Sequence, residues 1–216
     1  MICLGTLGLT ASAAGAVTVN FYTIPTSGGT PGNSVNNVAS QLTVDVTDGG
    51  TGGLFNFLVS TGLNSGANVT EIYFSDLLGI FTAPLTVVSQ AGALFTTGSA
   101  NPGNVPGANN ATPPFVLTAG LLADATGRST NGLTIGDSLL MGLSYSAGKS
   151  FSDVMAALTN GNLRVAMHVR SLTGGASDSV VSLPTTPVSN VPLPAAGLLL
   201  ASALFGAAAL RARRST

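Results

Sequence analysis

Two neighbouring segments of this chain alternate apolar and polar residues with a period of two, which restricts the fold more than any other feature. Residues 41–48 place leucine and valine on one face of an extended chain and threonine and aspartate on the other. Residues 54–60 repeat the alternation with phenylalanine and valine, after a glycine-rich turn at residues 48–53. The two segments therefore predict half-buried strands that pair as an antiparallel hairpin.

Further segments have the composition of short strands. They are residues 17–24, 69–75, 85–90, 138–144, 163–171 and 180–183. Only residues 151–159 predict a helix here, because Ser150 and Asp153 form a capping pair and Asn160-Gly161 provides a stop. Seven or eight short strands with glycine-rich turns and one short helix indicate an all-β fold, an antiparallel β-sandwich or jelly-roll-like domain.

Two parts of this domain are expected at its surface. Residues 98–114 are rich in asparagine, proline and glycine, with only Val105 both apolar and β-branched, so they predict a long exposed loop. In residues 163–171, the alternation directs Leu163, Val165, Met167 and Val169 inward. His168 is then expected on the outward face, together with Arg164 and Arg170.

The composition of residues 17–190 excludes several kinds of chemistry. The single cysteine of the chain is Cys3, so this part has no disulfide, thiol nucleophile or cysteine-ligated metal. Three of the seven Lys and Arg lie in the last six residues, which leaves four against all eight acidic residues. This balance gives no electrostatic reason to bind nucleic acid. No cofactor is indicated by any motif.

No catalytic residue is expected, so the chain is predicted not to be an enzyme. A Ser-His-Asp triad would need His168, the only histidine, and no serine lies in a Gly-x-Ser-x-Gly elbow. A glycosidase needs two carboxylates in a cleft. Glu71 could pair with Asp76 or with Asp137, but nothing in the sequence selects either pair.

A metal site is not expected either. Asp45 and Asp48, with the following glycines, offer carboxylate and carbonyl oxygens of the kind that Ca²⁺ prefers. The segment lacks the Asp-x-Asp-x-Asp-Gly spacing of a calcium loop, and an ordinary turn at the end of a strand explains it better.

The last 26 residues combine three features in a fixed order. They read Val191-Pro192-Leu193-Pro194-Ala195, then a small and apolar run to Leu210, then a basic end with Arg211, Arg213 and Arg214. The prolines exclude helix from the residues before them, and Pro194 suits a first helical position. A helix over residues 194–210 would span about 26 Å, near the lower limit for a bilayer core of about 30 Å. The segment predicts a C-terminal hydrophobic helix whose arginines stay in the cytoplasm.

This order of motif, helix and basic residues resembles the PEP-CTERM family of C-terminal sorting signals, in its VPLPA variant. The resemblance covers residues 191–216, and Leu193 stands where the more familiar form has glutamate. It implies transient membrane insertion, cleavage by an exosortase-type membrane protease, and delivery to the cell envelope or extracellular matrix of a Gram-negative bacterium. The alternative is a permanent anchor without processing, which would not need the Val-Pro-Leu-Pro-Ala junction.

The first 16 residues predict a signal peptide. Ala14-Gly15-Ala16 has the small-x-small pattern of a signal peptidase site, which gives cleavage after Ala16, and Ala13 is a second candidate. No Lys or Arg precedes the apolar stretch, which suggests a truncated or misassigned start. The expected organisation is therefore signal peptide 1–16, β-sandwich domain 17–184, linker 185–190 and sorting signal 191–216.

Two functions from different classes fit this organisation. The first is a non-enzymatic secreted surface or extracellular-matrix protein, associated with exopolysaccharide or biofilm, that binds glycan or copies of itself. The second is a secreted glycan-active enzyme on a jelly-roll scaffold with a carboxylate pair. With no Trp and three Tyr in the chain, platforms for stacking sugars are scarce, which counts against catalysis and tight glycan binding.

Overall fold

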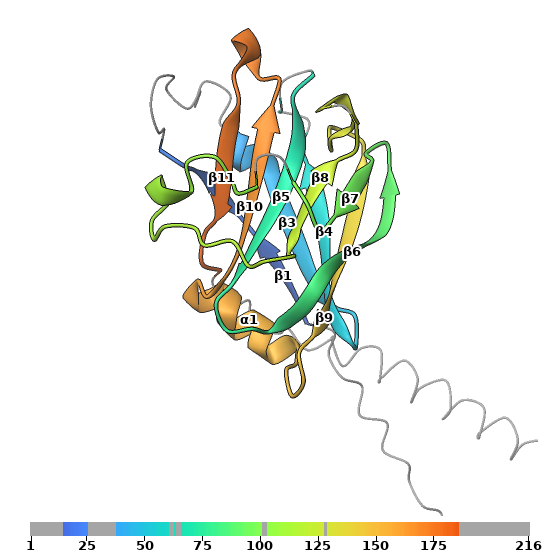
Figure 1. Cartoon of the computed structure of the whole chain (residues 1–216), viewed down its shortest axis with the longest axis vertical. Coiled ribbons are helices and arrows are strands. Elements are labelled where there is room, and N and C mark those ends of the chain that lie inside the picture. Colours follow the sequence, from blue (N-terminus) through green and yellow to red (C-terminus); the bar gives the residue numbers. More distant parts are fainter. Residues whose placement is uncertain are drawn as a thin grey trace, which may run out of the picture. The chain divides into compact units, whose positions relative to one another are not determined.

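The computed structural model describes residues 15–25, 38–60, 63, 66–100, 103–127 and 129–185, which form two antiparallel sheets and one α-helix (Figure 1). Sheet A has the strand order β1 (Ala16–Val19), β3 (Leu42–Asp48), β4 (Gly52–Val59), β9 (Ser138–Tyr145) and β6 (Phe81–Ala91). Sheet B has the order β2 (Phe21–Thr23), β11 (Asp178–Ser182), β10 (Leu163–Arg170), β5 (Asn68–Asp76), β8 (Leu122–Ala125) and β7 (Phe95–Thr97). The described residues from Ala16 onward belong to one compact unit, so the predicted antiparallel, mostly β fold is confirmed.

The main core lies between the sheets and is built around aromatic rings. Phe55 and Phe57 point inward from β4 and meet Phe74 of β5 edge to face, with ring centroids 5.0 and 6.4 Å apart. Edge-to-face packing of this kind contributes about 0.5–1.5 kcal/mol per pair beyond the burial of apolar area. The predicted alternation of β4 thus supplies the contacts that hold the two sheets together.

The predicted hairpin is confirmed as β3 and β4. The two strands pair from Leu42 opposite Val59 to Asp48 opposite Gly53. The turn between them needs glycine at Gly50, where φ is 82°, and the amide of Gly50 donates to Oδ1 of Asp48 at 2.8 Å.

The predicted single strand over residues 17–24 is wrong. Asn20 interrupts it, and the chain crosses from sheet A, where β1 pairs with β3, to sheet B, where β2 pairs with β11. Strands β7 and β8 do not follow from any pattern in the sequence. They are three and four residues long, and they pair with each other and, for β8, with β5, all of which are distant in the sequence.

The predicted helix is confirmed as α1 (Phe151–Asn160). The Asp153 carboxylate accepts hydrogen bonds from the backbone amide and the hydroxyl of Ser150, at 2.9 and 2.8 Å. These bonds hold the pKa of Asp153 below its usual range. Gly161 ends the helix in the left-handed region, with φ of 76°, as its position in the sequence predicted.

The prediction that residues 98–114 form a loop is confirmed for the part that the structure describes, but its full exposure is not, because Val105 and Ala111 are buried. Residues 103–117 run across the outer face of sheet B, where Figure 1 shows the light-green loop passing in front of β10 and β11. Buried side chains of this covering segment form a second apolar cluster with outward residues of the sheet. The cluster contains Val105, Ala111 and Phe115 of the segment and Ile24, Tyr73, Leu122, Ala166 and Val181. A few well-placed apolar side chains therefore order a segment whose composition is polar.

No helix among the described residues is both long and apolar enough to cross a membrane. The predicted C-terminal helix of residues 194–210 lies outside the described residues, as does the predicted signal peptide up to Ala14.

Candidate functional site

A row of polar side chains crosses the outer face of sheet B, beside the covering segment. Strand register places Glu71 of β5 directly opposite His168 of β10 and, on its other side, opposite Asp124 of β8. His168 in turn lies opposite Ser179 of β11. Directly opposite residues share one face of a sheet, with Cβ atoms about 4.5–5.5 Å apart, so these residues form one continuous row.

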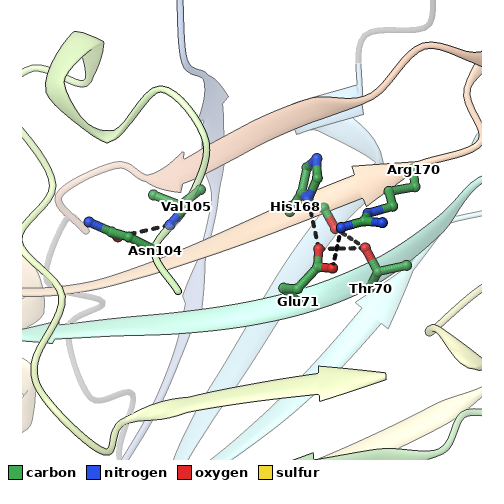
Figure 2. A network of polar contacts seen from close by, with 6 residues as sticks. All are labelled: Thr70, Glu71, Asn104, Val105, His168 and Arg170. Atoms are coloured by element: carbon green, nitrogen blue, oxygen red, sulfur yellow. Dashed lines mark hydrogen bonds and ion pairs between the residues drawn. The ribbon is translucent and has the colours of Figure 1, made fainter. Parts of the chain in front are cut away.

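Glu71 bonds to three neighbouring side chains. Its Oε2 lies 2.7 Å from Nδ1 of His168 and accepts a hydrogen bond of 2.6 Å from the hydroxyl of Thr70. Its Oε1 forms an ion pair of 2.8 Å with Nη2 of Arg170. Because an ionised carboxylate can only accept, Nδ1 of His168 carries the proton in this contact. Figure 2 shows the second ring nitrogen of His168 directed away from Glu71.

An irregularity in strand pairing brings Thr70 into this network. Register shifts between His168 and Val169, so that Thr70 is an extra residue of β5 between Val69 and Glu71. In a regular strand, neighbouring side chains point to opposite faces and could not bond to each other. The bulge allows the Thr70 hydroxyl to reach the Glu71 carboxylate on the outer face, and bulges commonly redirect side chains in this way.

The prediction that His168 is a surface residue is wrong. Its side chain is on the outward face of β10 as expected, but the residue is only 6% exposed, and Glu71 is 2% exposed. A buried carboxylate is stable only when its charge is compensated, and here two basic side chains and a hydroxyl surround it. The sequence carried a signal for this site, since outward acidic and basic residues lie on two of its clearest strands.

Arg164, the third residue expected to face outward beside His168, holds the covering segment instead. Its Nη1 donates to the carbonyl oxygens of Pro113 and Pro114, at 2.8 and 3.2 Å, and its guanidinium lies over the ring of Phe115. Burial lowers the pKa of Arg164, an effect that its interaction with Tyr22 partly offsets. Tyr22 adds a second attachment, because its hydroxyl accepts a hydrogen bond of 2.9 Å from the Thr112 amide.

The structure does not bring together Glu71 and Asp76, the first pair of carboxylates considered for glycoside hydrolysis. Glu71 and Asp76 are five residues apart on β5, about 16 Å in an extended strand, and an odd spacing puts them on opposite faces. Asp76 accepts from the Phe81 amide at 2.8 Å, and Asp137 accepts from the Thr134 amide at 2.9 Å. Glycosidase carboxylates lie about 5–10 Å apart across a cleft, so Glu71 and Asp76 do not have the required geometry.

Asp45 and Asp48, the residues considered for Ca²⁺, bond to neutral groups of the domain. Oδ1 of Asp45 accepts from the Thr18 hydroxyl at 2.6 Å, and Oδ1 of Asp48 accepts from the Tyr145 hydroxyl at 3.0 Å. Burial, followed by this contact with Asp48, raises the pKa of Tyr145. Within the described ranges, no three His, Cys, Asp or Glu side chains are grouped as a metal would require.

The outer face of sheet A carries an open hollow of about 170 Å³. Its walls come from β4, β6 and β9 and contain Leu54, Thr86, Val88 and Ser144 with several glycines, but no charged side chain. The groups that line the hollow can therefore form hydrogen bonds and apolar contacts with a ligand, but none of them could act as an acid or a base.

The predicted sorting residues cannot be placed in the structure. The motif Val191, Pro192, Leu193, Pro194 and Ala195, the arginines Arg211, Arg213 and Arg214, and the cleavage candidate Ala13 all lie outside the described residues. Ala16, the other cleavage candidate, is the first residue of β1. Cleavage after Ala16 would leave Val17 and Val19, the two buried residues of β1, in the mature chain.

Comparisons with known proteins give no assignment. No protein-family model, curated protein or solved structure matches this chain.

Proposed function

We propose that this chain is an exported surface or matrix protein that an exosortase-type protease processes at residues 191–195. The observation that carries the proposal is the order of Pro motif, apolar run and arginines in residues 191–216. In this proposal the two-sheet, jelly-roll-like domain is the part that is delivered to the surface. The helix of residues 194–210 is its transient membrane anchor.

The position of the motif supports this role. The last described residue, Thr185, donates its amide to the carbonyl of Leu158 at 3.1 Å, so the folded domain extends to that point. Val191 follows six positions later, and six residues reach about 20 Å at most. In the sequence, the motif therefore begins only six positions after the last described residue of the domain, where a membrane protease is proposed to cut.

The mature domain acts in this proposal by association with exopolysaccharide, without chemistry on the glycan. The hollow on sheet A supports this, because its hydroxyl, backbone and apolar groups suit an uncharged sugar chain. Hydrogen bonds to neutral hydroxyl groups do not need a charged partner. The near absence of charge in the chain as a whole agrees, with 7% charged residues.

Sorting is tested in the producing cells by comparing a strain that has the exosortase-type protease with one that lacks it. With the protease, the protein should appear in the envelope or medium without residues 197–216. Without it, the protein should stay in the membrane fraction with an intact C-terminus. The same distribution and the same C-terminus in both strains would contradict the proposal.

Association is tested with two valines of similar exposure on opposite sides of the domain. Val88, at the hollow, is 53% exposed, and Val116, on the covering segment, is 56% exposed. Val88→Lys should reduce retention of the processed protein on exopolysaccharide, because the ammonium group would occupy the hollow. Val116→Lys should leave retention unchanged. Equal retention of both variants would exclude the hollow, and concentration-dependent assembly without glycan would indicate self-association instead.

A further inference from the structure

Three adjacent strands of sheet B carry a serine, a histidine and a glutamate in one row. Ser179 of β11 lies opposite His168 of β10, which lies opposite Glu71 of β5, all on the outer face of the sheet. The order of the side chains is that of a nucleophile, a general base and a carboxylate that orients the base. Such a constellation is recognised by geometry and roles, whatever the order of the residues in the sequence.

The base and its carboxylate already have the relationship that this chemistry requires. The contact of 2.7 Å between Nδ1 of His168 and Oε2 of Glu71 fixes the imidazole and leaves Nε2 as the ring atom able to accept a proton. Glu71 is itself held by Thr70 and by Arg170, at 2.6 and 2.8 Å. The carboxylate is therefore preorganised and cannot rotate away from the imidazole without breaking these contacts.

The hydroxyl of Ser179 is available to the base. The carbonyl of Ser179 accepts a hydrogen bond from the Ile24 amide, but its hydroxyl bonds to no group in the part of the chain that the structure describes. Ser179 and His168 are 7% and 6% exposed, so each retains a small accessible surface. With Cβ atoms about 5 Å apart, a rotation of the serine brings Oγ toward Nε2. Hydrogen bonds of this kind are often long before substrate binds.

We propose that Ser179, His168 and Glu71 form a hydrolytic site for esters of short acyl groups, an activity beyond the proposed sorting and glycan association. Oγ of Ser179 attacks the acyl carbon while its proton passes to Nε2 of His168. The bond from that carbon to the alcohol oxygen breaks, and the alcohol leaves with the proton from Nε2. Water then attacks the acyl-serine through the same base, which releases the carboxylic acid and restores Ser179.

The surroundings of the row determine the substrate class. Ala166 and Val181, the next outward residues on β10 and β11, belong to the apolar cluster under the covering segment. Both are fully buried, so a substrate can approach only over the small exposed surface of Ser179 and His168. The low exposure of Ser179 allows only a slender group to reach Oγ, so acetyl esters fit and long acyl chains do not.

The purified protein is tested with p-nitrophenyl acetate, with release of nitrophenolate followed in time and the acetylated residue located by mass spectrometry. Acetyl should be found on Ser179, and Ser179→Ala should lower the initial release by about 100-fold or more. The matched control is Ser177→Ala, an exposed serine two residues earlier, which should react like the unmodified protein. Acetylation of other residues only, or equal rates for both variants, would overturn the proposal.

A second variant separates positioning from folding. Glu71→Gln keeps the size of the side chain but removes the charge that orients and supports His168. It should lower the rate constant of acylation by about 10-fold or more, with the ester concentration at half-saturation unchanged. A rate unaffected by Glu71→Gln in folded protein would contradict the role of Glu71. Faster reaction with p-nitrophenyl decanoate than with the acetate would contradict the short acyl group. The assay uses purified protein, so its result does not depend on whether sorting occurs.

Discussion

The guanidinium carbon of Arg164 lies 5.5 Å from the centroid of the Phe115 ring, which joins strand β10 to the segment that covers sheet B. Phe115 is 3% exposed and packs in the second apolar cluster. A cation over an aromatic ring contributes about 0.5–2 kcal/mol, more when both groups are desolvated. This contact and the buried ring make the covering segment an integral layer of the domain.

Phe115→Ala should therefore lower the free energy of unfolding by about 3–5 kcal/mol, the usual cost of removing a buried aromatic side chain. Urea unfolding of the purified protein measures the change. The neighbouring Val116→Ala is the control, since Val116 is largely exposed, and it should alter the free energy by about 0.5 kcal/mol or less. Equal small effects for both variants would mean that the segment is not packed on the sheet.

The capping pair of α1 predicts a dependence of stability on pH. Hydrogen bonds from Ser150 hold the pKa of Asp153 below its usual range, so the ionised carboxylate stabilises the folded state. This stabilisation is complete above the pKa of the unfolded chain, about 3.9, and disappears as the pH falls through the lower folded value. Asp153→Asn should lower the thermal midpoint at pH 7, and its difference from the unmodified protein should shrink below about pH 4. A difference that is constant from pH 7 to pH 3 would contradict this role of the carboxylate.

Removal of metal should leave the stability of the domain unchanged. The described residues contain no group of three metal-ligating side chains, and Asp45 and Asp48 bond to hydroxyl and amide groups. Thermal melts with and without a chelator should therefore coincide. A fall in the midpoint of more than about 5 °C would restore the calcium site at the end of β3.

The parts of the fold that the sequence predicted are those fixed by local rules. Strands β3 and β4 follow from alternation along each segment, and α1 follows from Ser150, Asp153 and Gly161, which lie within or next to it. Strands β7 and β8 could not be predicted, because short segments of this kind are stabilised by pairing with distant strands.

The candidate site was missed for a related reason. Alternation correctly placed His168 on the outward face of β10, but it cannot show that an outward face is covered. The residues that form the covering layer, Val105, Ala111 and Phe115, are scattered among glycine, proline and asparagine without periodicity. The contact of His168 with Glu71 joins residues 97 positions apart and depends on strand register, which a single sequence does not provide.

The Pro motif makes a separate prediction about processing. Replacing Pro192 and Pro194 together with alanine removes the residues that exclude helix, so the hydrophobic helix could extend back through the motif. The double variant should accumulate as an unprocessed, membrane-bound form, which fractionation and a tag placed after Thr216 would detect. A control with Ser189→Ala, just before the motif, should be processed normally. Normal processing of the double proline variant would show that the protease does not require an unwound motif.

The most direct test of the proposed function is the intact mass of the protein recovered from the surface of the producing cells. Sorting predicts a chain that begins at Val17, or at Ala14 if the signal peptide is cut after Ala13. It also predicts an end within residues 191–196, without the apolar run and without Arg211, Arg213 and Arg214. A mass that includes all residues to Thr216 would contradict the account and would leave a permanent C-terminal anchor as the explanation of residues 191–216.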